Sequence, residues 1–122
     1  MEEIKAEDVA FRNTDGNKEN KPTDIVISRT YPLENCRGIQ IVVMPGNKGF
    51  IPLIGKDEKK LYYMTSKNYH YFNLKKIKDW DKIETIVFKR IYKDGDGRSR
   101  LKESPFSVHI DKDGLITIKK EN

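Results

Sequence analysis

Cysteine and long apolar runs are nearly absent from this sequence. Cys36 is the only cysteine among 122 residues, so the chain can form no internal disulfide and no Cys₄ or Cys₂His₂ zinc site. The longest apolar runs, such as Ile41–Met44, are much shorter than the ~20 residues of a membrane-spanning helix. The N-terminus, Met-Glu-Glu-Ile-Lys, also lacks the basic start and apolar stretch of a secretory signal. These absences predict a cytoplasmic protein that does not interact with a membrane.

Motifs of catalysis and cofactor binding are missing as well. The sequence has no G-x-S-x-G turn for a nucleophilic serine. Gly46 and Gly49 are not followed by the lysine and helix of a phosphate-binding loop. His70 and His109 are the only histidines, and nothing in the sequence pairs either of them with Cys36, as nucleophilic catalysis would require. The sequence therefore offers no support for an enzyme and predicts no cofactor.

One spacing near the C-terminus is nevertheless compatible with a metal site. His109, Asp111 and Asp113 are two residues apart, and alternate residues of a strand point to the same side. An imidazole and two carboxylates could then converge on a cation, which would make a metal-dependent enzyme using His109 and Asp111 one interpretation. The competing interpretation places Asp111 and Asp113 in a turn, where aspartate side chains bind nearby backbone N–H groups.

Charge is what the sequence contains in abundance. Charged residues make up 35% of the chain and hydrophobic residues 36%, with a net charge of +5. This composition indicates one folded domain with a small core and a charged surface. The first 24 positions hold seven acidic residues and only four basic ones. We expect residues 1–23 to form an N-terminal strand and a flexible, loosely attached linker, and residues 24–122 to form a single β-rich domain.

Short runs of β-branched and aromatic residues recur along the chain, separated by polar segments that contain glycine. Such runs are typical of strands. Their regular spacing predicts a mainly β protein, a small antiparallel β-sandwich or barrel that combines a meander with a C-terminal hairpin. The expected strands are Glu7–Arg12, Ile25–Ile27, Ile39–Met44, Phe50–Ile54, Leu61–Thr65 and Ile83–Tyr92, with a hairpin loop over Pro45–Gly49. The spacing of apolar residues in Ile83–Tyr92 would also fit a helix.

The C-terminal hairpin has the clearest local signal. Residues 106–110 alternate apolar and polar side chains, and residues 115–119 form a second β-rich run. Between them, Asp111 and Gly114 suit the first position of a type I turn and the left-handed position that follows it. Pro105 is expected to mark the start of the first strand, where its missing N–H breaks no ladder bond.

Only one helix is predicted, and it is short. Asn73 is a suitable N-cap, and Leu74 and Ile77 form an apolar pair at i, i+3 spacing. This pattern is enough for one or two turns over residues 73–80.

Aromatic and basic residues are interleaved between positions 59 and 82, where six aromatic residues and seven lysines stand against two aspartates. Aromatic rings and lysines together can hold single-stranded nucleic acid, through base stacking and phosphate contacts. Tyrosine and tryptophan are also enriched at protein–protein interfaces. The residues predicted to contact a partner are Tyr62, Tyr63, Lys67, Tyr69, Tyr71, Lys75, Lys76 and Lys78.

These observations favour a non-catalytic binding module that acts through protein–protein interaction. Edge strands of a small sheet can pair with a strand of a partner, and a homo-oligomer would belong to the same class. Single-stranded nucleic-acid binding through the basic and aromatic face is the alternative. It is weakened because lysine predominates over arginine, which recognises phosphates and bases better.

Overall fold

The computed structural model describes residues 4–28, 36–50, 63–65 and 69–121 of the chain. These residues form two antiparallel sheets and three 3₁₀ turns, and no α-helix occurs among them. The turns are η1 (Ala6–Asp8), η3 (Leu74–Lys76) and η4 (Trp80–Lys82). The prediction of a mainly β, antiparallel protein is confirmed.

Each sheet is antiparallel throughout, and the strand orders are β1-β2-β6-β5 and β4-β3-β7-β8-β9. The four-stranded sheet consists of β1 (Val9–Arg12), β2 (Asp24–Ser28), β5 (Tyr63–Thr65) and β6 (Tyr69–Asn73). The five-stranded sheet consists of β3 (Cys36–Met44), β4 (Lys48–Phe50), β7 (Thr85–Lys93), β8 (Ser99–Ile110) and β9 (Ile116–Lys120).

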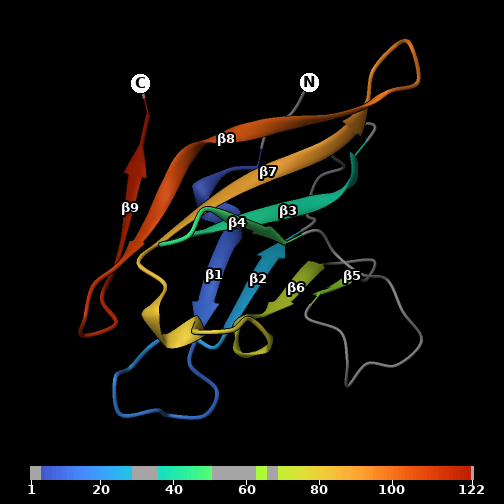
Figure 1. Ribbon diagram of the computed structural model, residues 1–122. Coiled ribbons are helices and arrows are strands. Elements are labelled where there is room, and N and C mark those ends of the chain that lie inside the picture. The colour runs from blue at the N-terminus through green and yellow to red at the C-terminus, as the bar shows by residue number, and fades with distance from the viewer. Residues whose placement is uncertain (1–3, 29–35, 51–62, 66–68, 122) are drawn as a thin grey trace.

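The two sheets share one core but do not close into a barrel. Closure would require an edge strand of one sheet to pair with an edge strand of the other, and no such pair exists among the described strands. Figure 1 shows the strands of the two sheets running in clearly different directions. Of the two predicted architectures, the barrel is therefore wrong.

The core is built from alternate residues of the strands, since successive side chains point to opposite faces of a sheet. In β7, Ile86 and Phe88 have no exposed surface, and the Phe88 ring lies 5.5 Å from that of Phe106, measured between centroids. Ile4 and Ala6, which precede β1, belong to the same cluster. The other core residues are Ile25, Ile27, Ile39, Ile41, Val43, Phe72, Leu74, Ile77, Ile83, Val108 and Ile110.

The predicted C-terminal hairpin is confirmed as β8, a turn and β9. The Oδ1 atom of Asp111 accepts hydrogen bonds from the backbone N–H groups of Asp113 and Leu115, both at 2.8 Å. Gly114 has a φ of 82°, a conformation that glycine adopts without steric strain. Of the predicted loop over Pro45–Gly49, residues 45–47 connect β3 to β4, and the last two residues belong to β4, which begins at Lys48.

Pro105 does not begin the strand, contrary to the prediction, because β8 already starts at Ser99. The register against β7 shifts between Val87 and Lys89, so this part of β8 is irregular. The backbone N–H of Glu121 donates to the carbonyl of Pro105 at 2.9 Å, one residue beyond the end of β9. No hydrogen bond within β9 therefore depends on the N–H that proline lacks, which explains why a proline is tolerated inside this strand.

The predicted helix over residues 73–80 is replaced by two separate 3₁₀ turns. Asn73 caps the first of them as expected, since its Oδ1 accepts the N–H of Lys75 at 3.1 Å. Asp79 has a φ of 59°, and this left-handed conformation interrupts a right-handed helix. The segment consequently forms η3 and η4 instead of one continuous helix.

The N-terminal strand is shorter than predicted. The expected strand Glu7–Arg12 begins only at Val9, because η1 occupies the preceding residues, and it is paired with β2. Of the expected strand Phe50–Ile54, residues 51–54 lie outside the described residues. Of the expected strand Leu61–Thr65, residues 63–65 form β5 and residues 61 and 62 lie outside the described residues. The division of the chain at residue 23 stays a prediction.

Candidate functional site

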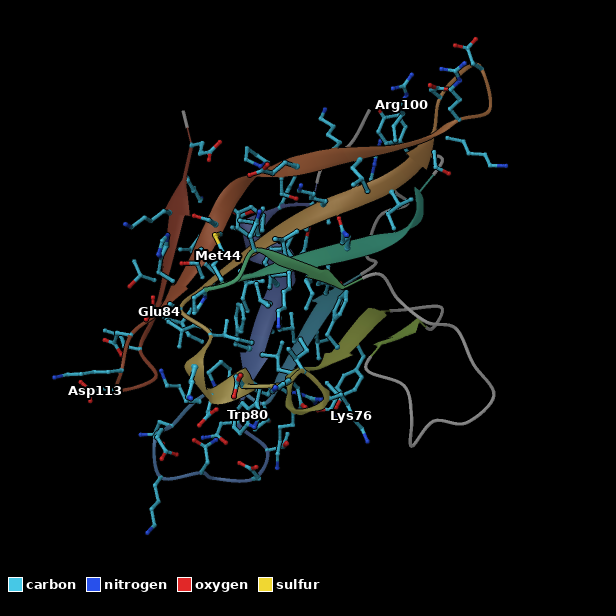
Figure 2. The ribbon with its side chains drawn as sticks, in the orientation of Figure 1. Met44, Lys76, Trp80, Glu84, Arg100 and Asp113 are labelled. Atoms are coloured by element: carbon cyan, nitrogen blue, oxygen red, sulfur yellow. The ribbon has the colours of Figure 1, made fainter. Side chains whose placement is uncertain are left out.

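The predicted partner-contacting residues lie on β5, β6 and the segment that contains η3 and η4. The lysines of the segment that contains η3 and η4 are exposed, and Tyr71 of β6 is half-buried. Figure 2 shows Lys76 and Trp80 at one end of the molecule, away from Arg100. Side chains are described for Tyr71, Lys75, Lys76 and Lys78, only the backbone is described for Tyr63 and Tyr69, and Tyr62 and Lys67 lie outside the described residues.

Tyr71 makes its polar contacts within the fold. Its hydroxyl donates to Oδ1 of Asp24 at 2.9 Å, and the Asp24 side chain is only 5% exposed. A guanidinium nitrogen of Arg12 lies 3.7 Å from the other carboxylate oxygen of Asp24, and the same guanidinium lies 5.8 Å from the centre of the Tyr71 ring. Three adjacent strands, β1, β2 and β6, are thereby joined through one buried carboxylate.

Lys75 is also engaged within the protein. Its ammonium lies 2.5 Å from Oδ2 of Asp15, a residue of the loop between β1 and β2, and 5.9 Å from the centre of the Trp80 ring. Lys76 and Lys78 are exposed neighbours in the same segment. The segment that contains η3 and η4 therefore has one lysine that binds the loop between β1 and β2, and two others that are exposed to solvent.

Replacing Lys75 by methionine is expected to raise the pKa of the Asp15 carboxyl. The Lys75 hydrogen bond, with a further one from Asn17, holds this pKa below its ordinary value. Because the pKa is lower in the folded than in the unfolded protein, the contact stabilises the fold at pH values above the unfolded-state pKa. This contribution disappears as the pH falls through the lowered value.

An NMR titration of the Asp15 carboxyl carbon measures this pKa directly. Lys76→Met is the matched control, since it removes a neighbouring positive charge but not the hydrogen bond. Equal Asp15 pKa values in the two variants would show that the contact does not form in solution.

His109 and Asp111 do not converge on one point. The His109 ring lies between two hydroxyls, with Nδ1 3.3 Å from Oγ1 of Thr85 and Nε2 3.2 Å from Oγ of Ser107. The Asp111 carboxylate accepts backbone N–H groups of its own turn, as the turn interpretation of the sequence expected. Within the described residues, no group of three His, Cys, Asp or Glu side chains is arranged to hold a metal ion.

The edge of the five-stranded sheet has a feature that the sequence did not reveal. Val43, Ile86, Val108 and Ile118 lie in register across β3, β7, β8 and β9, so they form one row on the inner face. The first three are at most 3% exposed, whereas Ile118 is 39% exposed. Leu115, in the turn before β9, is 67% exposed. Ile118, at the end of this apolar row, is therefore left partly uncovered, whereas the other three side chains are buried in the core.

The backbone of β9 has hydrogen-bonding groups that face away from β8. Asp111 donates to the Leu115 carbonyl, and Glu121 donates to the Pro105 carbonyl. Hydrogen-bonded pairs alternate along an antiparallel ladder, so residues 117 and 119 bond to β8. The N–H and C=O groups of residues 116, 118 and 120 point outward, and no other described strand pairs with β9.

The turn before β9 is anchored to the loop between β1 and β2. The ammonium of Lys21, a residue only 7% exposed, donates to the carbonyl of Asp111 at 2.6 Å. The backbone of Asn20 also lies so close to Gly114 that there is no room for a side chain there. These contacts fix the position of β9 relative to the four-stranded sheet.

A hollow of about 300 Å³ opens at the other end of β9. Ile4, Ala6 and Phe106 form its apolar lining, and Lys120 and Glu7 also line it. The Nζ atom of Lys120 lies 3.1 Å from Oε1 of Glu7. Figure 1 shows β9 on the outer side of the molecule, with β8 on its other flank. The free edge of β9 therefore offers a backbone ladder, the exposed side chain of Ile118 and an adjacent hollow.

The described part of the chain has no helix with the length and apolar character that could cross a membrane. Comparison with known proteins gave no match: no family model, curated protein or solved structure is similar to this chain. Its function has to be inferred from its own residues and their geometry.

Proposed function

We propose that this protein is a non-catalytic binding module that acts through protein–protein interaction at the free edge of β9. The observation that carries this proposal is the exposure of Ile118 at the end of a row whose other members are buried. A strand added to β9 would cover this side chain and pair with the outward N–H and C=O groups, the mode of binding known as β-strand addition.

The two faces of β9 define the kind of partner segment. On the inner face, the neighbours of an added strand would be Ile116 and Ile118, and the hollow beside Lys120 can take a further apolar side chain. On the outer face, the neighbours would be Thr117 and Lys119, both exposed. Cross-strand pairs of apolar residues and of opposite charges stabilise a sheet. The edge therefore suits an extended segment in which apolar residues alternate with acidic ones.

The lysines of β9 also make this edge selective. Charged residues, lysine above all, prevent sheet edges from pairing indiscriminately. Lys119 lies on the outer face in the C-terminal half of the strand, so a segment that places a positive charge directly opposite it would be destabilised. Specificity here would come from rejecting the wrong charge as much as from binding the right one.

Selection from a random peptide library tests the proposal. We expect enriched peptides to alternate apolar and acidic residues and to bind Ile118→Lys at least about tenfold more weakly than the unaltered protein, because burying an isoleucine contributes about 1.5–3 kcal/mol. Leu101→Lys is the matched control, since Leu101 is 49% exposed but lies on β8 near the far end of the sheet. Peptides that bind equally to both variants would overturn the β9 site.

Single-stranded nucleic-acid binding by the basic and aromatic face stays an alternative proposal. Its support is the exposure of Lys76 and Lys78 near Trp80, while Tyr71 and Lys75 are held by Asp24 and Asp15. Fluorescence anisotropy with labelled oligonucleotides, at low and near-physiological salt, distinguishes the two functions. Nucleic-acid binding would weaken steeply with salt.

A further inference from the structure

We infer that the partner of the β9 edge is a second copy of this chain, so that two five-stranded sheets join into one continuous sheet across a two-fold axis. This inference rests on the proposed function, because it uses the same edge, and it adds the identity of the partner. A symmetric dimer requires one patch that is complementary to itself.

The outward backbone groups of β9 meet this requirement in more than one register, and the register centred on Ile118 pairs all three outward residues of the strand with one another. If the two-fold axis passes through Ile118, Ile118 faces Ile118 of the second copy, and Ile116 faces Lys120. Residues 116, 118 and 120 are those whose N–H and C=O groups point outward. Each of them would therefore meet an outward-pointing residue of the other strand, as an antiparallel ladder requires.

The side chains also match in this register. An axis perpendicular to the sheet keeps the inner faces of both copies on the same side, so the two exposed Ile118 side chains would cover each other. On the outer face, Thr117 faces Lys119 of the second copy. No lysine lies directly opposite another lysine, an arrangement that would destabilise the pair.

Charge along β9 favours the antiparallel direction. The strand is preceded by a turn that contains Asp111, Lys112 and Asp113 and so carries a net charge of −1, and it ends with Lys119 and Lys120. Figure 2 shows Asp113 in this turn, at the outer end of the β8–β9 hairpin. Antiparallel pairing would bring the lysine end of each strand next to the acidic turn of the other, which lowers the electrostatic energy of association.

Sedimentation equilibrium over a range of protein concentrations tests the dimer. One five-residue strand is a small interface, so we expect a weak dimer with a Kd of roughly 10–100 µM. Ile118→Lys should raise this Kd at least tenfold, whereas Leu101→Lys should leave it unchanged. A chain that stays monomeric up to about 1 mM, or a dimer that Ile118→Lys does not weaken, would overturn the inference.

Two changes at Thr117 test the register. With the axis at Ile118, Thr117→Glu places a glutamate opposite Lys119 of the second copy and should lower the dimer Kd several-fold. Thr117→Lys places two lysines opposite each other and should raise it by a similar factor. If the axis passed through Thr117 instead, residue 117 would face itself, and both variants would weaken the dimer.

Peptides selected for binding to the β9 edge show whether only the dimer is refuted or the proposed function is refuted as well. If the dimer forms as inferred, these peptides should convert it to monomer, because both use the same edge. A monomeric chain that still binds them through Ile118 would refute the dimer but leave the proposed function standing. A monomeric chain that binds no such peptide would refute both.

Discussion

Replacing Gly114 by alanine is expected to destabilise the protein by about 2–4 kcal/mol and to loosen the β8–β9 turn. The φ of 82° at this position costs an L-residue about 1–2 kcal/mol. In addition, a Cβ atom would overlap the carbonyl oxygen of Asn20 and would lie only 2.6 Å from its carbonyl carbon. Since both are backbone atoms, the clash can be relieved only by moving a chain segment, which costs a further 1–2 kcal/mol or so.

Substitutions at two other glycines distinguish the cost of the backbone strain from the cost of the clash with Asn20. Gly97 also has a positive φ, 77°, but a Cβ there would meet nothing within 4 Å, so Gly97→Ala should show the backbone strain alone. A Cβ on Gly95 would likewise meet nothing within 4 Å, so Gly95→Ala should change stability by less than about 0.5 kcal/mol. Urea denaturation gives all three values. If Gly114→Ala costs no more than Gly97→Ala, the loop that contains Asn20 does not lie against the turn in solution.

Replacing Phe88 by alanine is expected to have the largest effect of any single change considered, a loss of about 3–5 kcal/mol. Phe88 has no exposed surface, and its ring packs on Phe106 between the two sheets. Folded proteins of this size are stable by only about 5–15 kcal/mol, so a large part of the total stability would be lost. The free energy of unfolding, again from urea denaturation, is the quantity to compare.

Leu101→Ala is the control for Phe88→Ala, because it removes an apolar side chain of the same sheet that is 49% exposed. Its expected effect is within about 0.5 kcal/mol. A loss below 1 kcal/mol for Phe88→Ala would mean that the sheets do not pack around this ring. The two variants together therefore test whether the core has the arrangement described.

The elements that the sequence alone predicted well are those whose signals are local. In the C-terminal hairpin, Asp111 bonds to backbone N–H groups two and four residues further on, and Gly114 takes the left-handed conformation that the turn needs. A run of β-branched and aromatic residues likewise identified β7, and alternation of apolar and polar residues identified the end of β8. These features depend on neighbours within a few residues, and for that reason a single sequence is enough to find them.

Local rules were less successful where the environment of a residue depends on distant strands. Pro105 resembles the start of a strand, yet it lies inside β8, at the point where the ladder to β9 ends. Arg90 is only 1% exposed, with its guanidinium 5.2 Å from the centre of the Tyr92 ring. Composition would assign such a residue to the surface. The position of Pro105 within a strand and the burial of Arg90 both depend on how segments far apart in the sequence pair.

The sequence by itself determined that this protein is mainly β and antiparallel, because alternation and turn chemistry act between neighbouring residues. Only the tertiary structure decided that the sheets stay open and that β9 forms an edge. It also decided that Tyr71 and Lys75 contact Asp24 and Asp15, which lie far from them in the sequence. Alternation shows which residues share a face of a strand, but it does not show what covers that face. Ile116 and Ile118 therefore have the same pattern as core residues, and the exposure of Ile118 becomes visible only when the strands are assembled.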